Sequence, residues 1–191
     1  MRTVYLFNMI SLDGYFEGPS KGQIDWHHVD AEFNAFAVDQ LKATDMLLFG
    51  RITYELMAGY WPTPSAISDD PEVAHMMNAI PKAVFSRSLG KADWNNTQLI
   101  KTDPAEAVVN FKQQGGKAIG IFGSADFAST LTTRGLIDEY RLIVNPVVLG
   151  AGTPLFKPMS DRLTLKLLST RPFTSGNVLL TYGPEKTTDP I

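Results

Sequence analysis

The stretch MLLFGRITYEL (Met46–Leu56) decides how this chain folds. Its first four residues form an uncharged run, typical of a β-strand that is buried on both faces. Gly50 permits a sharp turn or a close approach to a ligand, and Thr53 is the expected cap of a following helix. Because a helix N-terminus attracts anions and Arg51 carries forked donors that suit phosphate, the stretch predicts a phosphate-binding turn. A strand end beside a solvated Arg51 is the alternative interpretation.

The composition of the 191 residues is that of an ordinary globular protein. Hydrophobic residues make up 44% and charged residues 19%, so we expect one domain over residues 1–183 and a loose tail over 184–191. The net charge of −3 gives no basic field for nucleic acid, and no apolar run is long enough to cross a membrane. With no cysteine and three histidines without ligand spacing, we expect a cytoplasmic protein without a metal site.

The order of patterns along the chain predicts a mixed α/β sheet. The first part alternates strands with helices, which favours parallel pairing, whereas the last three strands follow one another without helices, which favours antiparallel pairing. The fold class is therefore a mostly parallel sheet with antiparallel C-terminal strands, flanked by helices. The expected strands are Thr3–Ile10, Met46–Phe49, Lys82–Phe85, Ala118–Phe122, Glu139–Leu149, Leu163–Thr170 and Val178–Tyr182. The expected helices start at Asp30, Thr53, Glu72, Asp103 and Ser124, and Gly59–Pro71 is expected to be a loop.

Three of these strands end in similar small or basic residues: Gly50-Arg51, Ser86-Arg87 and Gly123-Ser124. In an open α/β sheet, ligands bind beyond the carboxyl ends of parallel strands. If the three strands are neighbours, their ends form one crevice that suits the pyrophosphate of a dinucleotide. Arg87 would then suit a further phosphate, such as the 2′-phosphate of NADP; a surface arginine in a loop is the alternative. No G-x-G-x-x-G fingerprint follows the first strand.

Five motifs in this order resemble the dihydrofolate reductase-like family: SLDG, GRITYE, VFSRSL, IFGSADF and LIDEYRLIVNPVVLGAGTPLF. More narrowly, they resemble the C-terminal reductase domain of the bifunctional riboflavin-biosynthesis protein (RibD), over about Val4 to Tyr182. The resemblance implies the dihydrofolate reductase-like fold, NADPH as the hydride donor and a homodimer. It also implies that the substrate is a small heterocycle, as in 5-amino-6-(5-phosphoribosylamino)uracil reductase.

The resemblance also implies roles for individual residues. Asp13 matches an acidic position of the riboflavin-type reductases and is the implied catalytic carboxylate, although a turn residue bonded to its own backbone is the simpler interpretation. Where the family has a second glycine joined by a cis bond, this chain has Ser124, which leaves that bond open. The implied cofactor contacts are Ile10, Gly18, Gly50, Arg51, Thr53, Ser86, Arg87, Ser88, Gly123, Ser124, Ala125, Asp126 and Phe127, and the implied substrate contacts are Asn8, Trp26 and Phe122.

Folate reduction is the second hypothesis, and it would need a carboxylate in the first helix. The matching region near Phe33 and Asn34 has none, although Asp30 and Glu32 lie close by in the sequence. We therefore predict an NADPH-dependent oxidoreductase of riboflavin biosynthesis that acts on a pyrimidine or pteridine-like ring. A dihydrofolate reductase and a non-catalytic NADP(H)-binding protein remain the alternatives.

Overall fold

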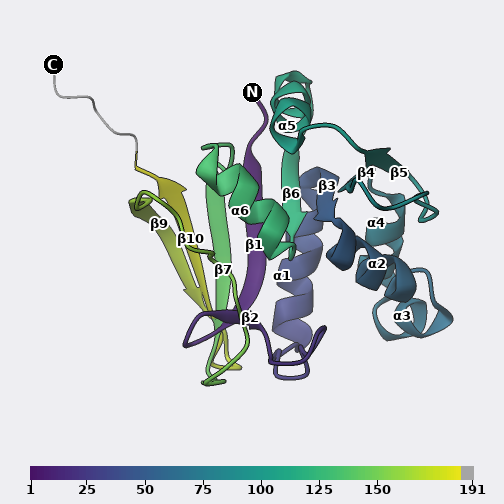
Figure 1. Ribbon diagram of the computed structural model, residues 1–191. Coiled ribbons are helices and arrows are strands. Elements are labelled where there is room, and N and C mark those ends of the chain that lie inside the picture. Colours follow the sequence, from purple (N-terminus) through teal and green to yellow (C-terminus); the bar gives the residue numbers. More distant parts are fainter. Residues whose placement is uncertain (186–191) are drawn as a thin grey trace, which may run out of the picture.

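A computed structural model describes residues 1–185, and an eight-stranded sheet runs through them (Figure 1). The strands of the chain are β1 (Val4–Ser11), β2 (Tyr15–Glu17), β3 (Thr44–Gly50), β4 (Lys82–Phe85), β5 (Thr97–Ile100), β6 (Ala118–Phe122), β7 (Glu139–Asn145), β8 (Thr153–Pro154), β9 (Leu165–Pro172) and β10 (Val178–Pro184). The main sheet has the order β5-β4-β3-β6-β1-β7-β10-β9, while β2 and β8 form a small separate pair. The pairs from β5 to β7 are parallel, and β10 pairs antiparallel with both β7 and β9. The predicted mixed sheet is thus confirmed.

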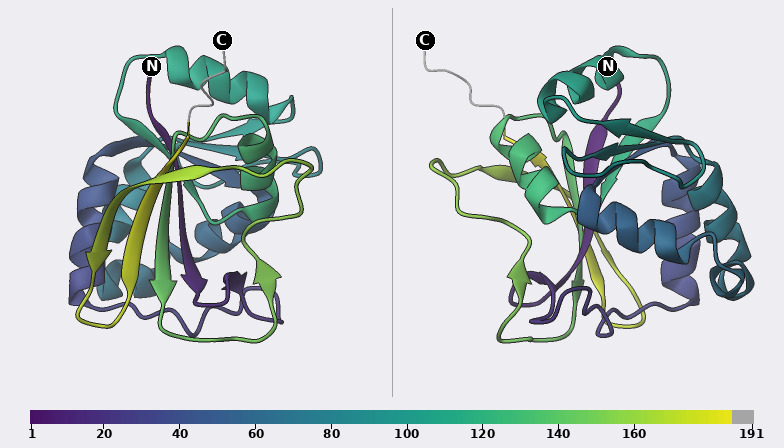
Figure 2. Two further views of the ribbon diagram at one scale, coloured as in Figure 1. Left: turned by 90° about the vertical axis from the view of Figure 1, so that its left-hand side faces the viewer. Right: turned by 45° about the vertical axis from the view of Figure 1, so that its right-hand side comes forward.

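Helices cover both faces of this sheet, as Figure 2 shows. They are α1 (Ala31–Lys42), α2 (Arg51–Tyr60), α3 (Pro64–Asp69), α4 (Pro71–Ala79), α5 (Pro104–Gln113) and α6 (Ala125–Thr133). On one face, Leu41 of α1, Tyr54 of α2 and Met77 of α4 share a core with the strands. On the other face, Val108 of α5 and Leu131 of α6 do the same. The sheet is therefore buried on both sides at its centre, which explains why its strands read as continuous apolar runs.

Three expectations about the elements were wrong, each for a local reason. The second helix starts at Arg51 rather than beyond a cap at Thr53, because Gly50 already takes the extended N-cap conformation. The segment Gly59–Pro71 contains α3, whose first residue is a proline that cannot donate a helical hydrogen bond and needs no partner. The strand expected to reach Leu149 stops four residues earlier, directly before Pro146.

The C-terminal boundary also differs from the expectation. Pro184 still belongs to β10, and the backbone N–H of Glu185 donates to the carbonyl of Thr164 at 2.9 Å. The rest of the expected tail, residues 186–191, lies outside the described part of the chain. No helix among residues 1–185 is both long and apolar enough to cross a membrane.

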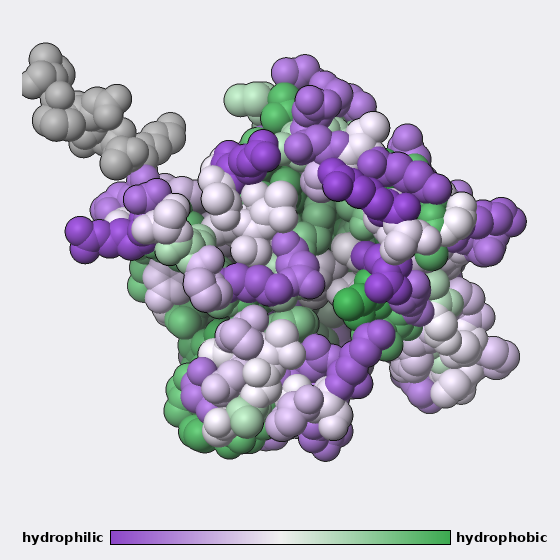
Figure 3. Space-filling model, in the orientation of Figure 1, coloured by the Kyte–Doolittle hydropathy of each residue, from purple (hydrophilic) through white to green (hydrophobic). Residues whose placement is uncertain are grey.

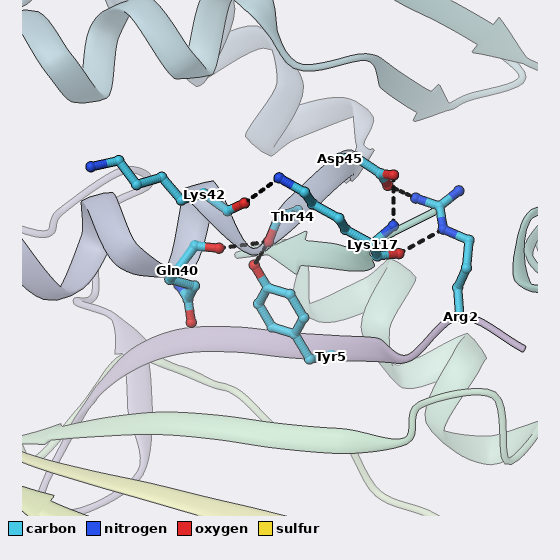
Figure 4. Close-up of polar contacts among 7 residues, drawn as sticks. All are labelled: Arg2, Tyr5, Gln40, Lys42, Thr44, Asp45 and Lys117. Atoms are coloured by element: carbon cyan, nitrogen blue, oxygen red, sulfur yellow. Dashed lines mark hydrogen bonds and ion pairs between the residues drawn. The ribbon is translucent and has the colours of Figure 1, made fainter. Parts of the chain in front are cut away.

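Polar contacts close the amino edge of the parallel strands (Figure 4). The buried guanidinium of Arg2 pairs with Asp45, which also accepts the backbone N–H of Lys117 at 2.7 Å. The Tyr5 hydroxyl lies 2.7 Å from the hydroxyl of Thr44, and burial raises the pKa of Tyr5 to about 12. These partners are all parts of the chain itself, so this edge is built for stability, and the opposite edge is the place to look for a ligand.

Candidate cofactor site at the strand ends

The carboxyl ends of β4, β3 and β6 lie side by side, which is the condition that the predicted crevice required. Gly50 at the end of β3 is in register with Phe85 at the end of β4. On the other side, Leu48 is in register with Ile121, so Gly50 lies level with Gly123 just after β6. Three turns that are far apart in the sequence therefore meet at one edge of the sheet, where α2 and α6 both begin.

Hydrogen bonds tie the turns after β3 and β6 together. The backbone N–H of Gly50 donates to the Ser124 hydroxyl at 3.0 Å, and the backbone N–H of Ser124 donates to the Thr53 hydroxyl at 2.9 Å. The Asn8 amide donates to the carbonyl of Gly123 at 3.3 Å and adds β1 to the group. The predicted residues of two separate motifs thus form one connected unit.

This unit is packed too closely for larger side chains. A Cβ atom added to Gly50 would lie 3.3 Å from the Cβ of Phe127, and one added to Gly123 would lie 3.0 Å from a Thr53 methyl group. Gly123 and Ser124 both have φ near +60°, a conformation that glycine adopts freely and serine rarely. The peptide bond between them is trans, as are the others of residues 1–185. The two helix starts can therefore approach each other backbone to backbone.

The helices α2 and α6 differ from the other four described helices in how they begin. Side chains of Asp30, Thr63, Asp70 and Asp103 accept backbone N–H groups at the starts of α1, α3, α4 and α5. The N-cap residues of α2 and α6 make no such bond. The first-turn N–H groups of these two adjacent helices, with the positive ends of their dipoles, are therefore available to an anion.

Three cationic side chains lie at this edge of the sheet, and they differ in the partners they have. One guanidinium nitrogen of Arg51, Nη1, donates to both carboxylate oxygens of Glu55 at 3.0 Å, and both side chains are about two-fifths exposed. Such an exposed pair is weak, so an incoming phosphate can replace the carboxylate. Arg87 is exposed just beyond β4. Lys157 pairs with Asp126 in the first turn of α6.

The turn after β4 is shaped by Ser86. Its hydroxyl accepts the backbone N–H groups of Leu89 at 2.9 Å and Ser88 at 3.2 Å. Preceding it, the ring of Phe85 stacks on Phe127 with 4.6 Å between centroids, which joins the end of β4 to α6. Ser86, Arg87 and Ser88 therefore form a compact turn directly beside the starts of α2 and α6.

The residues implied near the nicotinamide and the substrate are more dispersed. Ile10 packs against the apolar cluster of Ala125, Leu142 and Leu155, and the backbone N–H of Gly18 donates to Gln23 within its own loop. Phe122 is buried against the ring of Phe7 at 5.3 Å on the α1 face of the sheet, whereas Asn8, the next residue along β1, points to the α6 face. Trp26 donates to the carbonyl of Gln23 at 3.1 Å in the connection before α1. The structure does not gather Asn8, Trp26 and Phe122 into one pocket.

The carboxylate of Asp13 is exposed, and each of its oxygens accepts a hydrogen bond. Its two oxygens accept the backbone N–H groups of Leu149 at 3.1 Å and Gly150 at 2.8 Å. Hydrogen bonds from the Ser11 hydroxyl and from these backbone groups lower the pKa of Asp13 to about 2. The ionised form of the side chain is therefore favoured by Ser11 and the backbone of its own turn together with the backbone of a distant connection.

Two residues at this edge were missed from the sequence. Asn145 is fully buried, donates to the carbonyl of Ile10 at 3.2 Å and accepts the backbone N–H of His28 at 3.0 Å. The following Pro146, which ends β7, was the signal that could have marked it. Lys157 is the other, and no local pattern links it to Asp126, which lies 31 residues earlier in the sequence.

An open hollow of about 390 Å³ lies outside this edge, between α2 and the connection from β4 to β5. None of the predicted site residues lines it. The residues around it are Tyr54, Glu55, Ala58, Gly59, Pro62, Lys91, Asp93 and Trp94.

Comparisons with known proteins agree with the fold and identify the family. The uncharacterized protein YyaP of Bacillus subtilis strain 168 is 35% identical over 181 residues, covering 95% of this chain and 94% of its own. A structure assigned to riboflavin biosynthesis in Shewanella sp. PV-4 is similar with a TM-score of 0.74 and 20% identity, covering 96% of this chain and 99% of its own. Dihydrofolate reductase from Enterococcus faecalis, solved with NADP(H), has a TM-score of 0.62 and 14% identity, covering 96% and 97%, so the fold is dihydrofolate reductase-like. The family model of the RibD C-terminal domain matches residues 2–179, and the chain belongs to that family.

Proposed function

We propose that this protein is an NADPH-dependent reductase that binds its cofactor at the strand ends of β4, β3 and β6. The observation that carries the proposal is the meeting of two uncapped helix N-termini, those of α2 and α6. A pyrophosphate needs N–H donors, positive potential and closely approaching backbone. Gly50 and Gly123 provide the close approach, and the first turns of the two helices provide the donors. The residues present therefore fit the group.

Four further residues complete the proposed cofactor site. Arg51 would exchange its contact with Glu55 for a phosphate oxygen, because a forked guanidinium binds phosphate at least as well as a carboxylate. Arg87 would bind the 2′-phosphate, since it is exposed directly beyond β4 in the turn that Ser86 shapes. Ser88 and Asp126 remain proposed contacts in the same two turns, with Lys157 offsetting the charge of Asp126.

The proposed substrate is a small heterocycle, most like 5-amino-6-(5-phosphoribosylamino)uracil. Membership of the RibD C-terminal domain family and the similarity to a protein assigned to riboflavin biosynthesis support this choice. The nicotinamide would supply the hydride, while Ile10 and Gly18 would lie near it and exclude water. Asn8, Trp26 and Phe122 remain proposed substrate contacts, but their positions require either a movement of the connection before α1 or a substrate that meets only some of them.

The two carboxylates near the start of α1 argue against folate as the substrate. Asp30 accepts the backbone N–H of Phe33 and caps α1. Glu32 accepts the backbone N–H of Thr174 at 2.9 Å and its hydroxyl at 2.8 Å, and these bonds lower the pKa of Glu32. Both are committed to structural partners, so neither is free to hold a pterin ring.

The test begins with binding. NADPH and NADH are each titrated while the thermal unfolding midpoint is followed. A ligand that binds only the folded state raises the midpoint more when it binds more tightly, so NADPH, whose 2′-phosphate adds a contact, is expected to raise it further than NADH. Arg87→Ala should raise the Kd for NADPH by about 10- to 100-fold, the loss expected for hydrogen bonds to a charged group, and leave the Kd for NADH unchanged. Arg134→Ala, an exposed arginine at the far end of α6, is the matched control. An unchanged preference in Arg87→Ala contradicts its role.

Turnover is then measured from the loss of NADPH absorbance with the pyrimidine substrate and with dihydrofolate. Consumption with the pyrimidine supports the proposal, and consumption with dihydrofolate favours the second hypothesis. A shift of the thermal midpoint without consumption of either substrate would favour a non-catalytic NADP(H)-binding protein.

Our proposal also includes a homodimer in the cytoplasm, and sedimentation at working concentrations measures that assembly directly.

A further inference from the structure

A single carboxylate joins two connections that are far apart in the sequence. Asp13 follows β1, and its oxygens accept the backbone N–H groups of Leu149 and Gly150 in the connection from β7 to β8, 136 and 137 residues further on. Both N–H groups thus have a charged acceptor, a stronger partner than water or a neutral carbonyl. The turn SLDG is thus attached to the distant connection by two hydrogen bonds from one side chain.

Backbone hydrogen bonds on both sides of Asp13 join the same two segments of the chain. The N–H of Leu12 donates to the carbonyl of Val147 at 2.8 Å, and the N–H of Leu155 donates to the carbonyl of Gly14 at 3.2 Å. Beyond them, β2 pairs with β8. Asp13 lies in the middle of this row, so it fixes the start of the β1–α1 segment (residues 12–30) where the segment leaves the sheet.

The far end of the β1–α1 segment is also fixed. The backbone N–H of His28 donates to Asn145 at 3.0 Å, and its carbonyl accepts from Asn177 at 2.9 Å, both asparagines being fully buried. Between the two fixed ends the segment reaches α2, because a Cβ atom on Gly22 would lie 3.9 Å from a methyl group of Leu56. Figure 3 shows these connections as a lower lobe, with a hollow between it and the lobe of α2 and α3. The segment therefore runs along the carboxyl edge of the sheet.

We propose that Asp13 is a positioning residue, whose carboxylate holds the β1–α1 segment across the carboxyl edge of the sheet instead of transferring a proton. The inference rests on the proposed function in one respect, namely that this edge is where cofactor and substrate meet. A proton donor must be protonated part of the time at working pH. An oxygen pair that accepts two N–H groups favours the ionised form, and the low pKa of Asp13 agrees with this.

Hydrogen exchange of the backbone tests the anchoring without cofactor or substrate. In Asp13→Ala, the amides of Leu149 and Gly150 should exchange about tenfold faster, because each loses its acceptor and the two connections separate more often. Asp13→Asn keeps one acceptor oxygen and should give an intermediate rate. Asp161→Asn, an exposed aspartate that accepts from its neighbour Ser160, controls for the lost charge and should change neither amide. Unchanged exchange in Asp13→Ala would overturn the proposal.

Kinetics then separate positioning from proton transfer. A positioning role predicts that Asp13→Asn raises KM for the pyrimidine several-fold, while the pH profile of kcat keeps its shape. Loss of a general acid would instead lower kcat by about 10²- to 10⁴-fold and remove one limb of that profile, and this result would overturn the proposal. Failure of wild-type protein to bind NADPH would contradict the proposed function alone, because the exchange measurement judges the anchor independently.

Discussion

A carboxylate placed in the first turn of α2 should weaken cofactor binding without harming the fold. Ile52 is the second residue of this helix and is 41% exposed, so Ile52→Glu needs no space in the core. The helix dipole favours a negative charge there by about 0.3–1 kcal/mol. A bound pyrophosphate would be repelled: two unit charges 4 Å apart interact by about 1 kcal/mol in water and about 4 kcal/mol near a protein surface. At first-turn separations we expect about 1–2 kcal/mol, or roughly a 5- to 30-fold weaker Kd.

The assay compares two quantities that should move in opposite directions. The thermal midpoint of the free protein should stay level or rise slightly, while the Kd for NADPH should increase. Ile67→Glu makes the same substitution at an exposed position of α3, whose start is capped by Thr63, and should leave the Kd unchanged. The difference should shrink as salt is added, because exposed charges are screened. NADPH binding in Ile52→Glu that equals the wild type at low salt would refute an anion site at this helix start.

Three further changes have expected outcomes. Thr53→Val removes the acceptor of the Ser124 N–H. It should lower the free energy of unfolding in urea by about 1 kcal/mol and raise the Kd for NADPH. A variant with wild-type stability and wild-type NADPH binding would contradict this. Burial lowers the pKa of His27 from its ordinary 6.5 to about 4. Between these two pKa values the unfolded chain binds a proton that the folded chain does not. The free energy of unfolding should therefore fall by up to about 3 kcal/mol as the pH drops from 6.5 to about 4, and His27→Gln should reduce this dependence of stability on pH. Asp45→Asn weakens the amino-edge contacts and should destabilise by about 1–2 kcal/mol with an unchanged NADPH Kd, whereas a changed Kd would mean that the two edges are coupled.

Much of the fold could be predicted because its signals are local. The uncharged run before Gly50 exists because β3 has neighbours on both edges and helices on both faces. Asp103 and Pro104 mark the start of α5 since a carboxylate cap and a proline suit the first turn of a helix. Such features act within a few residues, and they appear in the sequence as patterns. The short strand β5 has no comparable pattern and was missed.

The candidate site was predictable only in part, because its details depend on contacts between distant segments. The small and basic residues after three strands indicated where the turns meet. That Thr53 accepts from Ser124 rather than capping α2 depends on the register of β3 with β6, which no single segment specifies. Asp13 is a similar case, since its partners lie in a connection far along the chain. The missing side-chain cap on α2 was also not predicted, because Thr53 was expected at the position that Gly50 takes.

The structure of the protein with NADPH bound tests the central claim most directly. Our account predicts pyrophosphate oxygens within hydrogen-bonding distance of the first-turn N–H groups of α2 and α6, with the Arg51 guanidinium moved away from Glu55. A cofactor found in the hollow beside Trp94, or one whose phosphates touch neither helix start, would contradict it.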